Sequence, residues 1–515
     1  RGVRQPVFFV IDVRSQPQPA DDLVTGPAAG RERFVVPGCG SASGIRSVAK
    51  IERPFDGTHV AGRSLRTRGA SLIDGLNDCR DGIHRRAVHR RQMSERRAAV
   101  VRQRAEQRID QAIARVLSRQ SSNGAFGLWR AESGDLWLDA YASDFLSRAR
   151  TKGYIVPDQA FARAMDNLRN RLNYAPDFDS GGEEVAYALL VLAREGAAAM
   201  GDLRYYADVK AEAFSTPMGA AQLGAALAAY GDQRRADKMF ARAAQMIAGQ
   251  GAEKPVWRVD YGTQLRDSAA VLALAVEAGS TAVNRDYLTA RVSGGDGHRS
   301  TQEAAWSLMA AQALVDNPED SGLRVNGQPV SGAFVEVMQG DSPADLSVTA
   351  ASGRSTDITL TRIGVPIVPP AARGYGFALT REYYTLEGEP VDLASVAVGT
   401  RLVTVLRVLP QEEIGARLMV NDPLPAGLEI DNPNLLRSGD LRDLDWLSLW
   451  EADHVEFRSD RFLAAVTSRG DDPITLAYMV RAVSPGEFHH PAASVEDMYR
   501  PAYRANTAAG RLQVK

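Results

Sequence analysis

A long succession of segments with helical periodicity is the feature that most constrains how this chain can fold. From Ser94 to about residue 316, apolar residues recur at spacings of three and four, and loops bearing Gly, Pro or Asp divide the segments. Segments such as "EVAYALLVLAREG", "AAQLGAALAAYGD" and "SAAVLALAVEAGS" pair a face of small residues with a face of Leu and Val. Helices of this kind can approach closely, so we predict helical hairpins arranged as an inner and an outer ring. The expected helices cover residues 94–117, 136–150, 158–172, 182–195, 203–212, 217–229, 233–248, 263–278, 284–291 and 300–316.

The pattern changes after "DNPEDSG" at 316–322, where segments of alternating polarity replace the helical period. Asn326-Gly327 is a hairpin-turn signal, and the Pro- and Gly-rich stretch 365–376 marks a boundary. Beyond this boundary, about seven strand-like segments predict an antiparallel β-sandwich. The expected organisation is therefore multidomain α + β, with a helical domain at 94–318, a small β module at 319–370 and a β-sandwich at 371–515.

Residues 1–93 do not show the pattern of a domain. Turn-forming residues, single arginines and short apolar runs alternate without keeping a period, and "PVFFVIDV" at 6–13 is the clearest strand. Two interpretations stay open. The segment is either poorly ordered or not in the native reading frame of the gene, because regular periodicity begins abruptly near residue 94.

Charge is unevenly distributed along the chain. Residues 1–98 carry 18 basic and 10 acidic side chains, whereas residues 99–515 carry 43 basic and 53 acidic ones. A basic arm is one signature of nucleic-acid binding. The arginines here are scattered and few aromatic residues lie among them, so we expect no nucleic-acid partner.

Cys39 and Cys79 are the two cysteines of the chain. Neither has a second Cys or a His at the spacing of a zinc site, so we expect no metal centre and no cofactor. No apolar run reaches the roughly 18 residues of a membrane span. The apolar segment at 6–13 is also too short for the core of a signal peptide.

Four stretches together resemble the bacterial alpha-2-macroglobulins, large protease-trapping proteins of the periplasm. "LSRQSSNGAFGLWR" (117–130) and "GDLWLDAYASDFL" (134–146) are similar to the first hairpins of the family's thioester domain, and "HRSTQEAAWSLMAAQAL" (298–314) is similar to its last. "PAASVEDMYRPAYRANTAAGRLQV" (491–514) is similar to the end of its terminal macroglobulin-like domain. The resemblance implies an α/α toroid of helical hairpins, a CUB-like β module and a terminal antiparallel β-sandwich. It also implies an endopeptidase inhibitor of the periplasm or cell envelope, with proteases as partners, and not an enzyme.

In the family, the β module also takes strands from the segment that precedes the toroid. Only the segment at 6–13 is available for this role here. We therefore expect an incomplete sheet in the β module, with exposed edges that favour association.

Members of the family that bind proteases covalently carry a thioester between a Cys and a Gln three residues later, an activated acyl group that a lysine can attack. In this chain Cys39 is followed at that position by Ala42, and Cys79 by Gly82. We therefore expect a chain without a thioester, and without the bait region of the family, that does not trap proteases covalently. A scaffold that docks to a membrane-bound protein of the cell envelope is an alternative.

A Met-Tyr pair in the terminal domain of the resembling proteins leans over the thioester and excludes water. It matches Met498-Tyr499 in "SVEDMYRP", and Ser494 and the acids before the pair are expected to cap a turn that presents both side chains. The resemblance places Phe126, Trp129 and Trp137 at one mouth of the toroid. We expect Met498 or Tyr499 to face this mouth as an interdomain latch.

Enzymes built on an α/α toroid are the other alternative, because fold alone does not decide function. A prenyltransferase needs a Cys in its zinc site, and the chain has none after residue 79. A terpene cyclase needs an Asp-x-Asp-Asp acid, where "DFDS" offers Asp177 and Asp179 but ends in Ser180. An inverting glycosidase needs two carboxylates across a cleft. The remaining candidates by residue type are Asp135, Asp139, Glu183, Glu184, His298 and the pair His489-His490, the last expected in a turn.

Overall fold

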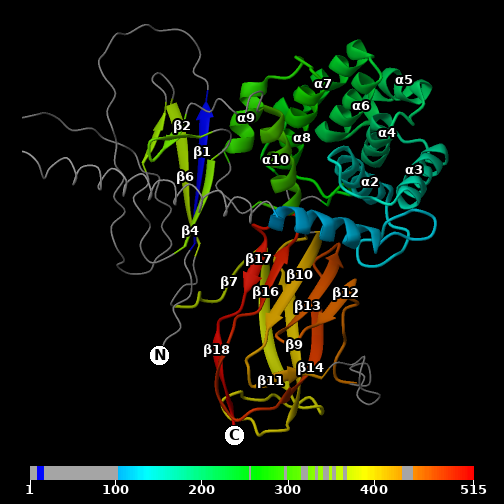
Figure 1. The fold of residues 1–515 in the computed structure, drawn as a ribbon. Coiled ribbons are helices and arrows are strands. Elements are labelled where there is room, and N and C mark those ends of the chain that lie inside the picture. The colour runs from blue at the N-terminus through cyan, green and yellow to red at the C-terminus, as the bar shows by residue number, and fades with distance from the viewer. Residues whose placement is uncertain are drawn as a thin grey trace, which may run out of the picture.

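The computed structural model describes residues 8–16, 103–253, 257–294, 299–314 and 323–515, the last range with gaps at 331–333, 340–346, 351–354, 364–367, 414 and 432–444. These parts form a helical domain, a small β module and a β-sandwich, in the order expected from the sequence (Figure 1). None of the helices in the described ranges is both long and apolar enough to cross a membrane.

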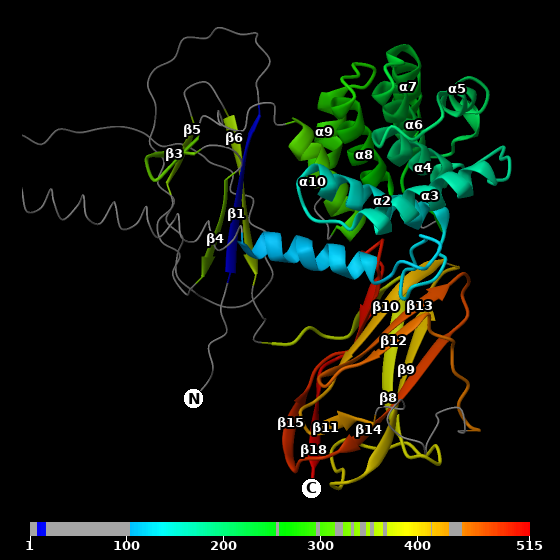
Figure 2. The same cartoon turned by 45° about the vertical axis from the view of Figure 1, so that its right-hand side comes forward.

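The helical domain is a double layer of antiparallel hairpins. Its helices are α2 (Leu136–Thr151), α3 (Asp158–Asn173), α4 (Glu183–Arg194), α5 (Met200–Asp208), α6 (Pro217–Ala229), α7 (Gln233–Ala248), α8 (Gln264–Glu277), α9 (Arg285–Ser293) and α10 (Thr301–Leu314). The even-numbered helices contact one another in succession from α2 to α10, and the odd-numbered helices pack outside them. This is the inner and outer ring of an α/α toroid. A further helix over residues 103–117 passes between this domain and the β-sandwich (Figures 1 and 2).

Burial explains why the inner segments are apolar on all sides. In α4 every residue from Val185 to Ala193 is buried, whereas the outer helix α7 buries a single stripe of Ala236, Met239, Phe240, Ala243 and Ile247. Small residues let the two layers approach. A Cβ at Gly224 of α6 would lie 3.2 Å from both the Ala236 carbonyl oxygen and the Phe240 ring.

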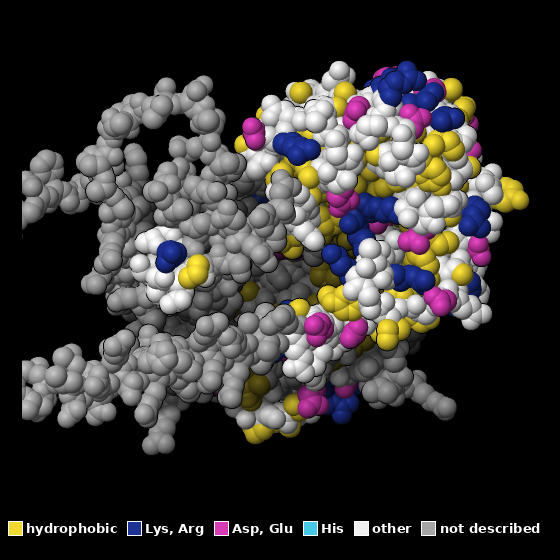
Figure 3. All heavy atoms as spheres, turned by 45° about the horizontal axis from the view of Figure 1, so that its top comes forward, with side chains coloured by type: hydrophobic (Ala, Val, Ile, Leu, Met, Phe, Trp, Pro, Cys, Tyr) yellow, Lys and Arg dark blue, Asp and Glu magenta, His cyan; other side chains and the backbone are white. Residues whose placement is uncertain are grey.

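The inner helices run in the same direction around the ring. At one end, the Asp135 carboxylate that caps α2 accepts the hydroxyl of Tyr261 just before α8. At the other end, Glu277 of α8 pairs with Arg148 of α2 and Arg194 of α4. Basic and acidic side chains are interspersed on the face of the helical domain seen in Figure 3 and form no patch of a single sign there.

One helix differs from the expected boundaries. The segment predicted as a helix over 203–212 forms α5, which ends at Asp208, followed by a 3-10 turn at Ala211–Ala213. The Lys210 ammonium group lies 2.8 Å from the Asp177 carboxylate and donates to the Phe178 carbonyl at 3.0 Å. These contacts hold Lys210 against the preceding loop, where the helix has already ended. The helix propensity of residues 203–212 alone does not predict such a contact with a distant loop.

The β module combines strands from distant parts of the sequence. Strand β1 (Phe8–Gln16), which includes most of the strand expected at 6–13, lies between β4 (Phe334–Gln339) and β6 (Ser355–Ile363) and is antiparallel to both. A second sheet has the order β3-β2-β5, formed by Gln328–Val330, Leu323–Val325 and Val348–Ala350. Asn326 and Gly327 have φ angles of 51° and 79° and form the predicted hairpin turn between β2 and β3. In the described residues, β4 and β6 are the outer strands of the first sheet.

The β-sandwich contains more strands than the seven or so expected. Its strands are β7 (Arg373–Tyr375), β8 (Phe377–Tyr384), β9 (Arg401–Pro410), β10 (Ala416–Pro423), β11 (Leu428–Ile430), β12 (His454–Phe457), β13 (Arg461–Ser468), β14 (Ile474–Ala482), β15 (Gly486–His490), β16 (Ser494–Asp497), β17 (Arg504–Asn506) and β18 (Gly510–Val514). They form sheets of order β12-β13-β10-β16-β17-β7 and β11-β14-β9-β8 and a β15-β18 pair. Strands β7, β15, β16 and β17 were not predicted because they are short and lie among prolines and polar residues. His489 and His490, expected in a turn, lie in β15.

Candidate interdomain site

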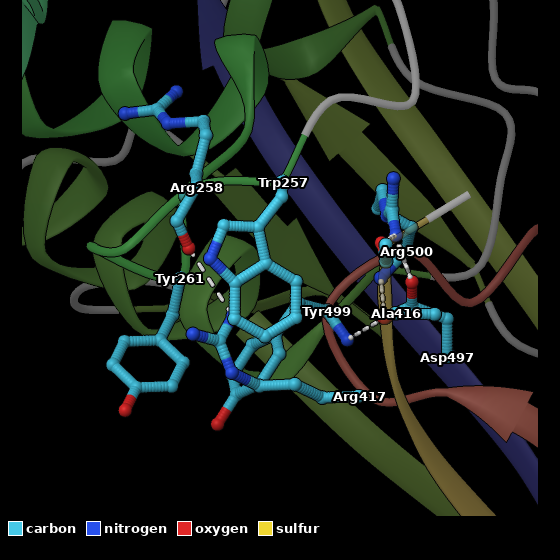
Figure 4. A pocket seen from close by; sticks show the side chains of 10 residues that line it. Trp257, Arg258, Tyr261, Ala416, Arg417, Asp497, Tyr499 and Arg500 are labelled. Carbon is cyan, nitrogen blue, oxygen red and sulfur yellow. Dashed lines mark hydrogen bonds and ion pairs between the residues drawn. The ribbon is translucent and has the colours of Figure 1, made fainter. Parts of the chain in front are cut away.

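Met498 and Tyr499, the residues expected to form the latch, lie in the turn that follows β16. Figure 4 shows Tyr499 beside Arg417 at the junction with the helical domain. The Asp497 carboxylate holds this turn, because it accepts the backbone N–H groups of Tyr499 at 3.0 Å and Arg500 at 3.2 Å. Ser494, which was expected to share this role, instead lies in β16 and pairs with strands on both sides. A capped turn was therefore expected correctly, and of the residues expected to cap it, Asp497 does so.

Tyr499 contacts the helical domain directly. Its ring centroid lies 5.0 Å from that of Tyr261, and the side chain packs against the helical core. The Tyr261 hydroxyl donates to Asp135 at 2.7 Å, and its ring lies 5.2 Å from Trp137. Burial raises the pKa of Tyr499 to about 12, so its phenol is neutral at physiological pH. The result is a continuous aromatic contact from the sandwich into the toroid.

Arg417 of β10 lies beside this contact. Its guanidinium carbon is 3.7 Å from the Trp257 ring centroid, 4.0 Å from that of Tyr261 and 5.8 Å from that of Tyr499. One guanidinium nitrogen donates to the Arg258 carbonyl oxygen at 3.1 Å. Burial lowers the pKa of Arg417, and the neighbouring tyrosines and acids oppose this shift. These distances describe a cation stacked among aromatic rings.

The segment that carries Trp257 and Tyr261 is fixed by a buried ion network. Arg258 and Arg266 each contact both Asp260 and Asp267, with the closest nitrogen–oxygen distances between 2.6 and 2.8 Å. The two arginines hold the pKa of Asp260 well below its usual value, against the effect of burial. A Cβ at Gly262 would lie 1.8 Å from the Arg266 guanidinium, so this position requires glycine. Tyr261 itself has a φ of 55°, which is unfavourable for an aromatic residue.

The site encloses little free space. The cavity lined by Trp257, Tyr261, Arg417 and Tyr499 has a volume of about 20 Å³, roughly the space of one water molecule. The described residues include no cluster of His, Cys, Asp or Glu suited to a metal ion. The arrangement therefore joins two domains and leaves no room for a small-molecule substrate.

The residues expected at the toroid mouth take different positions. Phe126 and Trp137 are buried in the helical core, and the Trp137 ring contacts that of Tyr261, which in turn contacts Tyr499. Trp129 stacks on His454 of β12 at 5.0 Å and so forms a second contact between the domains. Met498 is half-buried, and its N–H donates to the Arg417 carbonyl at 2.9 Å. The loop at 257–262, which has no periodicity, contributes the Tyr261 ring that contacts Tyr499, and the latch role of Met498 or Tyr499 stays a prediction.

The acidic residues considered for catalysis have structural partners. Asp139 is buried and accepts from the Phe126 N–H at 2.6 Å and from Asn167 and Arg171 at 2.8 Å each, which ties the loop at 123–130 to α2. Asp135 caps α2, and Glu183 and Glu184 lie in the first turn of α4. Asp177 and Asp179 pair with Lys210.

Among the described residues, the hydroxyl and imidazole candidates lie apart from one another. The Ser180 hydroxyl lies 2.9 Å from that of Ser215. His490 is buried next to the Tyr383 hydroxyl at 2.9 Å, and His489 on the same strand is exposed. Cys39, Cys79 and His298 lie outside the described residues.

Two family models match the chain. The model described as "A-macroglobulin TED domain" matches residues 87–174, and the one described as "Bacterial Alpha-2-macroglobulin MG10 domain" matches residues 376–502. Alpha-2-macroglobulin of Escherichia coli K12 is 31% identical over 437 residues, which cover 79% of this chain and 26% of that protein. The protein of the same name from Xylella fastidiosa Temecula1 is 30% identical, over 77% of this chain and 26% of that protein. The chain thus spans about a quarter of the length of the curated relatives it matches.

Solved structures agree with these matches. The crystal structure of native E. coli alpha-2-macroglobulin from domain MG7 to the C-terminus has a TM-score of 0.67 and 29% identity, over 79% of this chain and 67% of that one. Salmonella alpha-2-macroglobulin reacted with methylamine has a TM-score of 0.66 and 30% identity, over 78% of this chain and 27% of that one. The chain therefore belongs to the bacterial alpha-2-macroglobulin family and corresponds to its C-terminal region, with a TED domain and an MG10 domain.

Proposed function

We propose that the chain is the C-terminal part of a broad-range protease inhibitor, and that it holds its TED and MG10 domains together without trapping proteases covalently. The observation that carries the proposal is the contact of Tyr499 with Tyr261 across the two domains. Solved structures describe the E. coli relative as activated by porcine elastase and by trypsin. Proteases are therefore the partner class we assign to this chain, in the periplasm or cell envelope.

The chemistry of the two cysteines supports the non-covalent part of the proposal. A thioester needs the side-chain amide of a Gln three residues after the Cys, so that the sulfur can be acylated. Ala42 and Gly82 occupy these positions and have no amide side chain. Without a thioester at Cys39 or Cys79, neither a protease lysine nor a small amine finds an activated acyl carbon at these positions.

The latch then has a mechanical role. Tyr499 need not exclude water from a thioester, but it joins the MG10 turn to the loop before α8. Met498 fixes the turn within the MG10 domain through its N–H bond to the Arg417 carbonyl. The neutral phenol of Tyr499 and the buried ring of Tyr261 suit this role, because packing these two side chains together adds no further charge to the junction beside that of Arg417.

The test is incubation of the full chain with trypsin and with elastase, followed by denaturing electrophoresis. We expect no SDS-stable adduct, with or without prior methylamine treatment, while E. coli alpha-2-macroglobulin is run alongside for comparison. Adducts that methylamine abolishes would show that the chain does trap covalently. Protease activity towards a large protein and a small peptide is measured in the same mixtures, and the inhibitor role predicts selective protection of the large substrate. If neither substrate is protected and no complex forms by gel filtration, the chain has no inhibitory role of its own.

A further inference from the structure

Arg417 presents an unusual combination of charge and surroundings. The carboxylates of Asp135 and Asp497 lie near enough to favour its charge, but its close neighbours across the junction are the rings of Trp257 and Tyr261 and the Arg258 carbonyl oxygen. Both rings belong to the TED domain, whereas Arg417 lies on β10 of the MG10 domain. A cation that stacks on two aromatic rings of another domain and donates to a carbonyl oxygen there is held as a ligand is held in a binding site, even though both domains are in one chain.

The two domains fit each other closely around Trp257. A Cβ at Gly415 would lie 3.1 Å from the Trp257 Cβ, so the backbone beside β10 lies directly against this side chain. The Arg469 guanidinium also lies over the indole, at 5.0 Å. Figure 4 shows Trp257, Tyr261, Arg417 and Tyr499 gathered at this junction.

We propose that the TED domain carries a guanidinium-binding site, formed by Trp257, Tyr261 and the carbonyl oxygen of Arg258, and that Arg417 is its ligand. Filling this site positions the latch. The Arg417 carbonyl accepts the N–H of Met498, and its guanidinium lies 5.8 Å from the Tyr499 ring. This inference rests on the latch proposed above and names the residue that positions it.

Contacts within the TED domain help to hold its side of the site in place. Tyr261 is fixed by its hydrogen bond to Asp135, and Arg258 by its ion pairs with Asp260 and Asp267. Because Gly262 has no side chain, the Arg266 guanidinium can pack directly against the loop. A site held in this way can bind a guanidinium again after Arg417 is removed, although its loop is then less well fixed. It favours a planar guanidinium, which stacks on rings and donates to a carbonyl in one geometry.

The test uses the substitution Arg417→Ala in the full chain and hydrogen–deuterium exchange of the segments 257–263 and 498–503. We expect exchange in both segments to become about tenfold faster, the effect of losing a desolvated cation–π contact. Methylguanidinium at millimolar concentration should restore slow exchange, and methylurea, which has the same shape without the charge, should not. Equal restoration by both compounds, restoration by neither, or unchanged exchange in the variant would overturn the proposal.

Two further variants keep the test decisive. Arg407→Ala removes an arginine that pairs with Glu382 on the other sheet, and it should leave both segments unchanged. If Arg417→Ala does not fold, Arg417→Gln replaces it, and the same rescue by methylguanidinium but not by methylurea is required. Because no protease enters these measurements, failure here would leave the inhibitor role untouched, and failure of that role would leave the guanidinium site standing.

Discussion

At the residue scale, His490 shows how a buried imidazole in the MG10 domain makes stability depend on pH. Its ring nitrogen lies 2.9 Å from the Tyr383 hydroxyl, and the side chain is buried. Burial lowers the pKa of His490 to about 3, with further contributions from Arg381 and His489. The unfolded chain therefore binds a proton between about pH 6.5 and pH 3 that the folded domain excludes.

We predict that the free energy of unfolding of the MG10 domain falls as the pH is lowered. The contribution of His490 is fully present above the unfolded pKa, and about 2 kcal/mol of it should be lost between pH 7 and pH 5. Urea unfolding of the wild type and of His490→Gln at each pH measures this. The free energy of unfolding of His490→Gln should depend less steeply on pH than that of the wild type. His489→Gln, which changes an exposed neighbour on the same strand, should keep the wild-type dependence. Parallel slopes for all three proteins would contradict the prediction.

At the element scale, the start of α10 is joined to the start of α8. The Ser300 hydroxyl accepts the N–H of Glu303 at 3.2 Å, and the Glu303 carboxylate accepts the N–H of Ser300 at 2.7 Å, which is a capping box. The same carboxylate accepts the hydroxyl of Thr263, the N-cap residue of α8, at 2.7 Å. One buried side chain thus completes two helix termini of the inner ring.

We predict that Glu303→Ala destabilises the TED domain more than Ser300→Ala does. Loss of the serine cap costs about 1 kcal/mol. Loss of Glu303 leaves two buried donors without an acceptor and should cost about 2–4 kcal/mol. Asn284→Ala, which removes the exposed cap of α9, is the matched control. Thermal unfolding of the three variants checks the order, and equal losses for Glu303→Ala and Asn284→Ala would show that the shared cap is unimportant.

Elements whose own residues determine them could be predicted from the sequence, and contacts between distant elements could not. The inner helices were predicted because burial on all sides leaves an apolar segment, and the β2–β3 turn because Asn326 and Gly327 tolerate positive φ. Tyr499 was found through the family resemblance. Arg417 was missed because it occupies the outward position of an alternating strand, between buried Ala416 and Leu418. Only the second domain shows that this outward face is covered.

At the scale of the whole molecule, the two domains have separate cores joined at a small junction. One buried cluster belongs to the helical domain and another to the sandwich, and Tyr499 packs against the helical one. Trp129 and His454 provide a second contact between the domains. The junction can therefore open without unfolding either domain.

We predict that Tyr499→Ala loosens the junction and leaves both domains folded. Cleavage between residues 365 and 376 by a dilute protease should become severalfold faster, because the exposed stretch at 368–375 connects the β module to the sandwich. The unfolding transitions of the two domains should stay within about 0.5 kcal/mol of the wild type if only the junction is weakened. Tyr287→Ala, an exposed tyrosine of α9, serves as the control. Unchanged cleavage would exclude the latch role of Tyr499.

The positive φ of Tyr261 affects how tightly this junction closes. A left-handed backbone costs an aromatic residue about 1–2 kcal/mol, and the rings of Tyr499 and Trp137 on either side help to hold it at 55°. Departure of the MG10 domain removes Tyr499 and Arg417 and lets this peptide relax. Return of the domain must impose the strained conformation again before the rings can stack. The strain at Tyr261 therefore offsets part of the free energy gained when the rings stack, and a junction without it would close more tightly.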